Sequence, residues 1–185
     1  MVPSEIVDKA CERALALIDA GAARGNVLSC LIQAAEQISP PGAVSSILVL
    51  DEQGLLRNGH SPGLPSDYLE AIDRLKPNPR VGTCAAAAAT AAVVVTPDFL
   101  ADDKWAELKH LPLSLGFVGA WSTPIFSARS VAVLGTFGTY YRDRREPTLF
   151  EVKSIEKLAS LAGLVLDRDA SAEAVRAQRL LKESA

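Results

Sequence analysis

Two β-rich runs lie close together in residues 116–141, and they constrain the fold more than any other feature of the chain. The first run, residues 116–125, is apolar and carries a proline near its end, and the second covers residues 131–141. A polar break at residues 127–130 separates the two runs. Such runs joined by a polar turn predict a β-hairpin, and the proline suits the end of a strand. A β-sheet is therefore expected at the centre of the fold.

The N-terminal part of the chain is predicted to form two helices. Apolar residues recur at three- and four-residue spacing within residues 4–20 and again within residues 25–39. This spacing predicts helices that each carry one apolar face. Ser4 can cap the first helix and Gly21 can end it, while the Pro-Pro-Gly sequence at residues 40–42 ends the second.

Further strands and helices are predicted between and after these segments. The β-prone runs 43–50 and 55–60 flank a turn, and the valines at 93–95 form the strongest short β segment. The remaining segments favour helix: residues 65–75, residues 84–89, a helical and loop-like region at 97–112 that ends before Pro112, and a long helix from Thr148 through Leu166 that continues to Leu181.

This order of elements predicts an α+β protein, within the broad α/β class. We expect a central, mostly antiparallel sheet of five to six strands, with the terminal helices on one face. Short helices and loops from residues 64–112 should cover the other face. Because loops on a rigid scaffold can vary without disturbing the core, a ligand pocket is expected between the sheet and this middle layer.

Composition excludes several classes of function. A chain of 185 residues suits one domain, and its net charge of −3 with dispersed Lys and Arg argues against a nucleic-acid partner. No run approaches the ~20 apolar residues that a membrane helix needs. The first residues do not lead into a secretory segment. We therefore expect a cytoplasmic protein with neither a membrane nor a nucleic-acid partner.

The cysteines and histidines predict neither a metal site nor catalysis. Cys11, Cys30 and Cys84 are odd in number and widely separated, which favours reduced thiols over disulfides. His60 and His110 have no neighbouring Cys or His that could complete a metal site, and both are expected to face solvent. Neither has a nucleophile at a motif spacing. No catalytic residue, metal or cofactor is predicted.

Six short motifs, taken with the order of elements, resemble those of bacterial sensory GAF domains. The resemblance covers about residues 25–168, which leaves an N-terminal helix at 1–24 and a C-terminal helical tail at 169–185. It implies a GAF-like fold that acts as a stand-alone receptor or adaptor. The motifs are Leu50–Gly54, Val81–Cys84, Asp103–Trp105, Trp121–Ile125, Leu134–Phe137 and Tyr140–Tyr141.

Two departures from the GAF pattern make the expected cavity less polar. Relatives commonly continue the Gly-Thr-Cys motif with Gly and Thr, where this chain has Ala85 and Ala86, and often carry Arg where it has Val118. These losses disfavour a phosphorylated ligand such as a cyclic nucleotide. The GAF family includes a nitrate receptor, and a small anion such as nitrate is the leading expectation. Backbone N–H groups at residues 83–86 can bind charge at a helix start.

Thr83, Cys84, Ala85 and Ala86 are accordingly the first candidate ligand-binding residues. Thr83 can also cap the helix that follows, and capping and ligand binding can coexist. Cys84 has two alternatives: a redox sensor whose thiol pKa is lowered at a helix start, or a small buried residue.

Five more candidates come from a strand and from the middle layer. Trp121 offers an apolar ring with one N–H donor, which suits either a pocket wall or simple packing in the core, and Ser122 follows it. Strand alternation puts these two on opposite faces, and the sequence leaves open which face lines the cavity. Tyr68, Phe99 and Trp105 can close the pocket from the middle layer, or they can simply pack in the core.

The expected function is a non-enzymatic GAF receptor that binds a small ligand and signals through its terminal helices. A histidine kinase or another signalling protein is the expected partner. A homodimer is predicted through the helices that contain Leu17 and Leu158, because their apolar stripes exceed what the sheet needs. Two alternatives stay open: an enzyme that reduces free methionine sulfoxide with two cysteines, and a dimerisation scaffold without a ligand.

Overall fold

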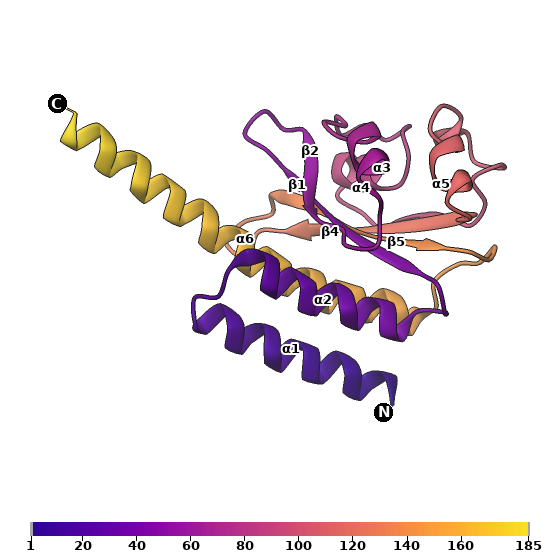
Figure 1. Cartoon of the computed structure of the whole chain (residues 1–185), viewed down its shortest axis with the longest axis horizontal. Helices are drawn as coiled ribbons and strands as arrows, with labels where there is room; N and C mark the ends of the chain where they lie inside the picture. Colours follow the sequence, from indigo (N-terminus) through magenta and orange to yellow (C-terminus); the bar gives the residue numbers. More distant parts are fainter. Residues whose placement is uncertain (1, 185) are drawn as a thin grey trace.

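The computed structural model describes residues 2–184 and shows one antiparallel sheet between two layers of helices (Figure 1). The strand order is β2-β1-β5-β4-β3. The predicted α+β fold with its antiparallel sheet is therefore confirmed, with five strands. Their bounds are Val44–Leu50 for β1, Leu56–His60 for β2, Val94–Thr96 for β3, Gly119–Phe126 for β4 and Val133–Tyr141 for β5.

The terminal helices α1 (Pro3–Asp19), α2 (Arg24–Ile38) and α6 (Leu149–Glu183) lie together below the sheet in Figure 1. Their apolar faces bury residues such as Ala14, Leu31 and Leu158 almost completely. Helix α1 packs against both α2 and α6. The C-terminal part of α6 projects beyond the sheet (Figure 1). Within residues 2–184, no helix combines the length and the apolar character that crossing a bilayer requires.

The opposite face of the sheet is covered by short helices and loops, and a second core lies there. The helices are α3 (Ser66–Ala71), α4 (Cys84–Thr90), the 3₁₀ helix η1 (Asp103–Trp105) and α5 (His110–Ser114), of which α3, α4 and α5 are labelled above the sheet in Figure 1. The second core includes Leu48, Tyr68, Phe99, Phe117 and Tyr140. The two cores meet only through the sheet, so a strand residue belongs to one or the other.

Four boundaries differ from the prediction, and prolines and glycines explain three of them. Helix α1 begins at Pro3 rather than at a Ser4 cap, because proline suits the first helical position. Pro112 lies in the first turn of α5, where its missing N–H costs nothing, so it does not end the helical region. Gly116 has a φ of +82° and ends α5, so β4 begins only at Gly119. Helix α3 ends at Ala71 rather than continuing to residue 75.

Helix α6 is tied to the sheet at two points. At its start, Thr148 and Glu151 form a capping box, and buried Glu151 also binds Arg145 at 2.6 Å. Farther along the helix, Asp167 accepts hydrogen bonds from Ser127 Oγ at 3.0 Å and from the Ala128 N–H at 2.7 Å. These contacts hold the β4–β5 hairpin against α6.

Candidate functional site

A small cavity lies between the sheet and the middle layer, where the sequence predicts a pocket. Its volume is about 20 Å³, close to the space of one water molecule. Five predicted site residues line it: Tyr68, Thr83, Cys84, Ala85 and Trp105. The remaining lining residues are Leu48, Ile72, Leu75, Val81, Gly82, Leu108 and Tyr140. The walls are therefore mainly apolar, with a few polar groups.

Trp105 belongs to the cavity lining and has an indole N–H that is unpaired within the described residues. The ring is buried at the end of η1, and among residues 2–184 its Nε1 atom has no hydrogen-bond acceptor. Phe99 supports the ring, with 4.3 Å between ring centroids. Asp102 holds the start of η1 by accepting hydrogen bonds from the Lys104 N–H and from Thr96 Oγ1. The donor is thus fixed in position and free to bind an acceptor.

Tyr68 and Tyr140 form the second polar group of the cavity. The Tyr68 hydroxyl donates to the Tyr140 hydroxyl at 2.9 Å, and the rings meet edge to face. Burial raises the pKa of Tyr68, and it raises the pKa of Tyr140 well above the ordinary range. Both hydroxyls therefore stay protonated at neutral pH. Since the Tyr140 oxygen accepts from Tyr68, its own proton is available to a ligand.

Cys84 and Thr83 line the cavity and also join a chain of hydrogen bonds with Ser122, and Cys84 is buried, as one of its two alternatives predicts. Ser122 Oγ donates to Thr83 Oγ1 at 3.0 Å and lies 3.0 Å from Cys84 Sγ. Thr83 itself has helical backbone angles and makes no side-chain cap, so the predicted capping role is wrong. Its hydroxyl is engaged by β4. Burial raises the pKa of the Cys84 thiol, which opposes the lowered pKa of a redox sensor.

Four predicted residues lie outside the cavity lining. Ser122 supports Cys84 from β4, Phe99 supports Trp105, and Ala86 is buried within α4. Trp121 belongs to the other core: its Nε1 donates to the Tyr141 hydroxyl at 2.6 Å on the side of the terminal helices. The expectation that Trp121 walls the pocket is therefore corrected. The strand alternation that the sequence left undecided turns Ser122, and not Trp121, toward the middle layer.

Tyr140 lines the cavity although it was not among the predicted site residues, and His60 is less exposed than predicted. Tyr140 pairs with Ala120 across β4 and β5, two residues from the pair of Ser122 with Gly138, so strand periodicity places it on the cavity side.

His60 is half-buried rather than exposed, and its Nε2 has no partner among the described residues. Cys11 and Cys30 lie in α1 and α2, on the other face of the sheet from Cys84. No three Cys, His, Asp or Glu side chains in residues 2–184 gather around a common point suited to a metal.

Comparison with known proteins is consistent with this geometry. The family model described as GAF domain matches residues 3–167. A methyl sulfide methyltransferase-associated sensor from Methanosarcina acetivorans is 32% identical to this chain over 165 residues. The match includes 89% of this chain but spans only 16% of that relative's length.

Two solved structures illustrate the similarity of fold. The GAF domain of a phosphoenolpyruvate-protein phosphotransferase from Coxiella burnetii has a TM-score of 0.70 at 17% identity, over 90% of this chain and 96% of that one. A type II free methionine-R-sulfoxide reductase from Thermoplasma acidophilum has a TM-score of 0.64 at 14% identity, over 78% and 93%. At such identities the similarity establishes the fold alone.

Proposed function

The chain belongs to the GAF domain family, and we propose that it is a sensory module that binds one small molecule between the sheet and the middle layer. The observation that carries this proposal is the buried N–H of Trp105, a residue of the cavity lining, which has no hydrogen-bond partner among residues 2–184. Leaving a buried donor unsatisfied costs about 1–3 kcal/mol. A ligand that supplies an acceptor would recover this free energy.

The chemistry of the cavity favours an uncharged ligand with one acceptor. Its lining contains no Lys, Arg or His side chain, so a buried anion would lack a counter-charge. Nitrate can accept hydrogen bonds from Trp105 and Tyr140, and it is therefore the second candidate, with the weaker expected affinity. Because the cavity holds about 20 Å³, either ligand requires the middle layer to move outward. The elements that would have to move are α3 and η1, which contribute Tyr68 and Trp105 to the lining.

Two adjacent tyrosines provide a route from the cavity to α6. Tyr140 contacts the cavity, while the next residue, Tyr141, donates to Glu151 Oε1 at 3.3 Å in the first turn of α6. A ligand can shift α6 only if it prefers one of two arrangements of this strand. We propose that Tyr140 detects the ligand and that Tyr141 passes the change to the capping box.

We also propose that α6 presents the signal to a second copy of the chain or to a partner such as a histidine kinase. Leu158 itself is buried in the core of this chain, so we place the interface on the exposed part of the same helix. The projecting part of α6 instead exposes Val175, Leu180 and Leu181. Light scattering should show a dimer at micromolar concentration, and Leu181→Asp should weaken it. A monomer in both proteins would exclude the homodimer.

A free methionine sulfoxide reductase is the alternative of a different class, and the cysteines weigh against it. Such chemistry needs a thiolate and a second thiol close to it. Cys84 is buried with a raised pKa, whereas Cys11 and Cys30 lie across the sheet. Turnover of free methionine sulfoxide with a thiol reductant would overturn the proposal of a non-enzymatic sensor.

Native mass spectrometry of the purified protein tests ligand binding. We expect a small molecule to remain bound to the wild type and to be lost from Trp105→Phe, which keeps the apolar ring and removes the donor. Trp121→Phe is the matched control and should retain the ligand. Added nitrate and dimethyl sulfide then compare an anion with an uncharged compound. Dimethyl sulfide is chosen because the Methanosarcina relative is named a methyl sulfide methyltransferase-associated sensor. Equal retention by both tryptophan variants would contradict the site.

A further inference from the structure

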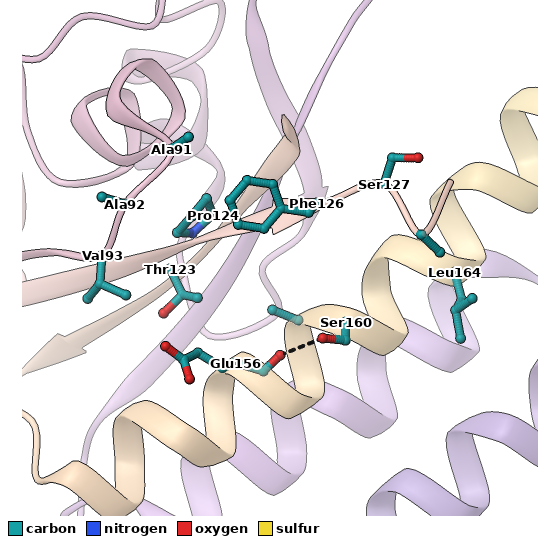
Figure 2. A pocket seen from close by; sticks show the side chains of 12 residues that line it. Ala91, Ala92, Val93, Thr123, Pro124, Phe126, Ser127, Glu156, Ser160 and Leu164 are labelled. Carbon is teal, nitrogen blue, oxygen red and sulfur yellow. Dashed lines mark hydrogen bonds between the residues drawn. The ribbon is translucent and has the colours of Figure 1, made fainter. Parts of the chain in front are cut away.

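A second hollow lies at the edge of β4 that extends beyond β3, beside α6. It is a groove of about 510 Å³ between β4, the turn before β3 and α6 (Figure 2). This volume lies within the usual range for small-molecule sites. Phe126 and Leu164 are each more than one third exposed, so the groove opens to solvent. Its apolar walls are formed by Ala91, Ala92, Val93, Pro124, Phe126, Ala159 and Leu164.

One hydroxyl and one carboxylate give this groove a polar end. Thr123 is only 3% exposed, and its Oγ1 has no hydrogen-bond partner among residues 2–184. Glu156 is the only charged residue of the lining. In Figure 2 the Thr123 hydroxyl and the Glu156 carboxylate point toward the same end of the groove. Lys153 pairs with Oε2 of Glu156 from the exposed side, and within the described residues Oε1 has no ion-pair partner.

We propose that this groove binds an amphipathic cation, with its apolar body against Phe126 and Leu164 and its protonated amine at Glu156 and Thr123. The carboxylate and the hydroxyl are both acceptors, which suits an ammonium group with three donors. A ligand with a carboxylate would be repelled by the negative charge of Glu156. An uncharged alcohol would gain the apolar contacts without the charge-assisted hydrogen bond.

Because α6 lines the groove, a ligand bound there contacts this helix directly and does not have to occupy the cavity around Trp105. The groove is lined on one side by Glu156, Ser160 and Leu164 of α6 and on the other by Phe126–Ala128 of the hairpin. Asp167 holds the same hairpin through Ser127 and Ala128. A bound molecule would therefore contact both α6 and the β4–β5 hairpin, which Asp167 already links. This second site goes beyond the proposed function and does not rest on it.

Isothermal titration calorimetry with hexylamine, which is protonated at neutral pH, tests the proposal. We expect saturable 1:1 binding that is at least about tenfold tighter than that of 1-hexanol, with no binding of hexanoate. Glu156→Gln should weaken hexylamine binding at least about fivefold and leave 1-hexanol unchanged. Lys153→Gln is the matched control: it removes the competing cation and should leave binding equal or tighter.

Two further variants guard against misfolding and against other occupants. Thr123→Val removes an unpaired hydroxyl at constant shape, so the fold should persist while hexylamine binding weakens. Ser160→Leu places a larger side chain in the groove from an exposed position and should abolish binding. The proposal would be overturned if the wild type shows no saturable binding of hexylamine. It would also be overturned if Glu156→Gln and Ser160→Leu bind hexylamine as tightly as the wild type does. A wild-type dimer that Ser160→Leu converts to a monomer would also overturn it, because a second copy would then cover the groove.

Discussion

Trp121 and Ser122 are neighbours in β4, yet their side chains lie in different cores. Trp121 Nε1 donates to the Tyr141 hydroxyl beside the terminal helices, whereas Ser122 Oγ contacts Cys84 beneath the cavity. Successive residues of a strand point to opposite faces. One strand thus supports the candidate site with Ser122 and anchors the terminal helices with Trp121.

The first prediction concerns the hydrogen bond between Trp121 and Tyr141. Tyr141→Phe leaves the buried indole N–H without an acceptor and removes one hydrogen bond to Glu151. The free energy of unfolding should fall by about 1–3 kcal/mol. Urea unfolding followed by circular dichroism measures this change. The double variant Trp121→Phe/Tyr141→Phe should lose less unfolding free energy than the sum of the losses in the two single variants. Strict additivity would show that the two side chains do not interact.

The layers of the fold could be predicted from the sequence, but the assignment of β4 could not. Helical spacing in the terminal segments and the β runs between them depends on local pattern, which the sequence contains. Both faces of β4 are buried, and both carry apolar residues, so Trp121 and Ser122 were equally compatible with the cavity. The partner of Thr83 is Ser122, 39 residues away, and no local rule predicts that contact. Trp105 was a candidate from its motif, but its unpaired donor required the structure.

A second prediction uses the close approach of α6 to β4. A Cβ atom added at Gly163 would lie 2.2 Å from the main-chain oxygen of Phe126, and this oxygen cannot move away easily. Alanine normally stabilises a helix by about 1 kcal/mol relative to glycine. Here the clash should dominate, and Gly163→Ala should destabilise the protein by at least about 1 kcal/mol.

The matched control for Gly163→Ala lies in α2. No atom approaches an added Cβ at Gly25 within 4 Å, so Gly25→Ala should leave stability unchanged or raise it by up to about 1 kcal/mol. Thermal unfolding compares the two variants. The same direction of change in both would show that helix propensity outweighs packing at Gly163.

A third prediction concerns acid stability and the position of Trp105. Burial alone would raise the pKa of Asp102, but hydrogen bonds from Lys104 and Thr96 outweigh it and lower the pKa below its ordinary value of 3.8. A lowered pKa in the folded state stabilises the protein at higher pH, and this contribution disappears as the pH falls through the folded-state pKa. The stability difference between the wild type and Asp102→Asn should therefore be constant near neutrality and shrink below pH 3.8.

Urea unfolding of both proteins at a series of pH values measures this difference. Because Asp102 fixes the start of η1, the emission of Trp105 should also change in the variant, recorded in a Trp121→Phe background. A stability difference that grows as the pH falls would contradict the prediction that ionised Asp102 stabilises the folded protein.

The most direct test of the central claim is the ¹H–¹⁵N spectrum of the two indole N–H groups. Trp105→Phe assigns the two signals. The protein is then titrated with the compound that native mass spectrometry identifies. The account predicts that saturation moves the Trp105 signal strongly, because its Nε1 gains an acceptor, while the Trp121 signal, already bonded to Tyr141, moves little. A stationary Trp105 signal at saturation would contradict the proposal that this cavity is the sensory site.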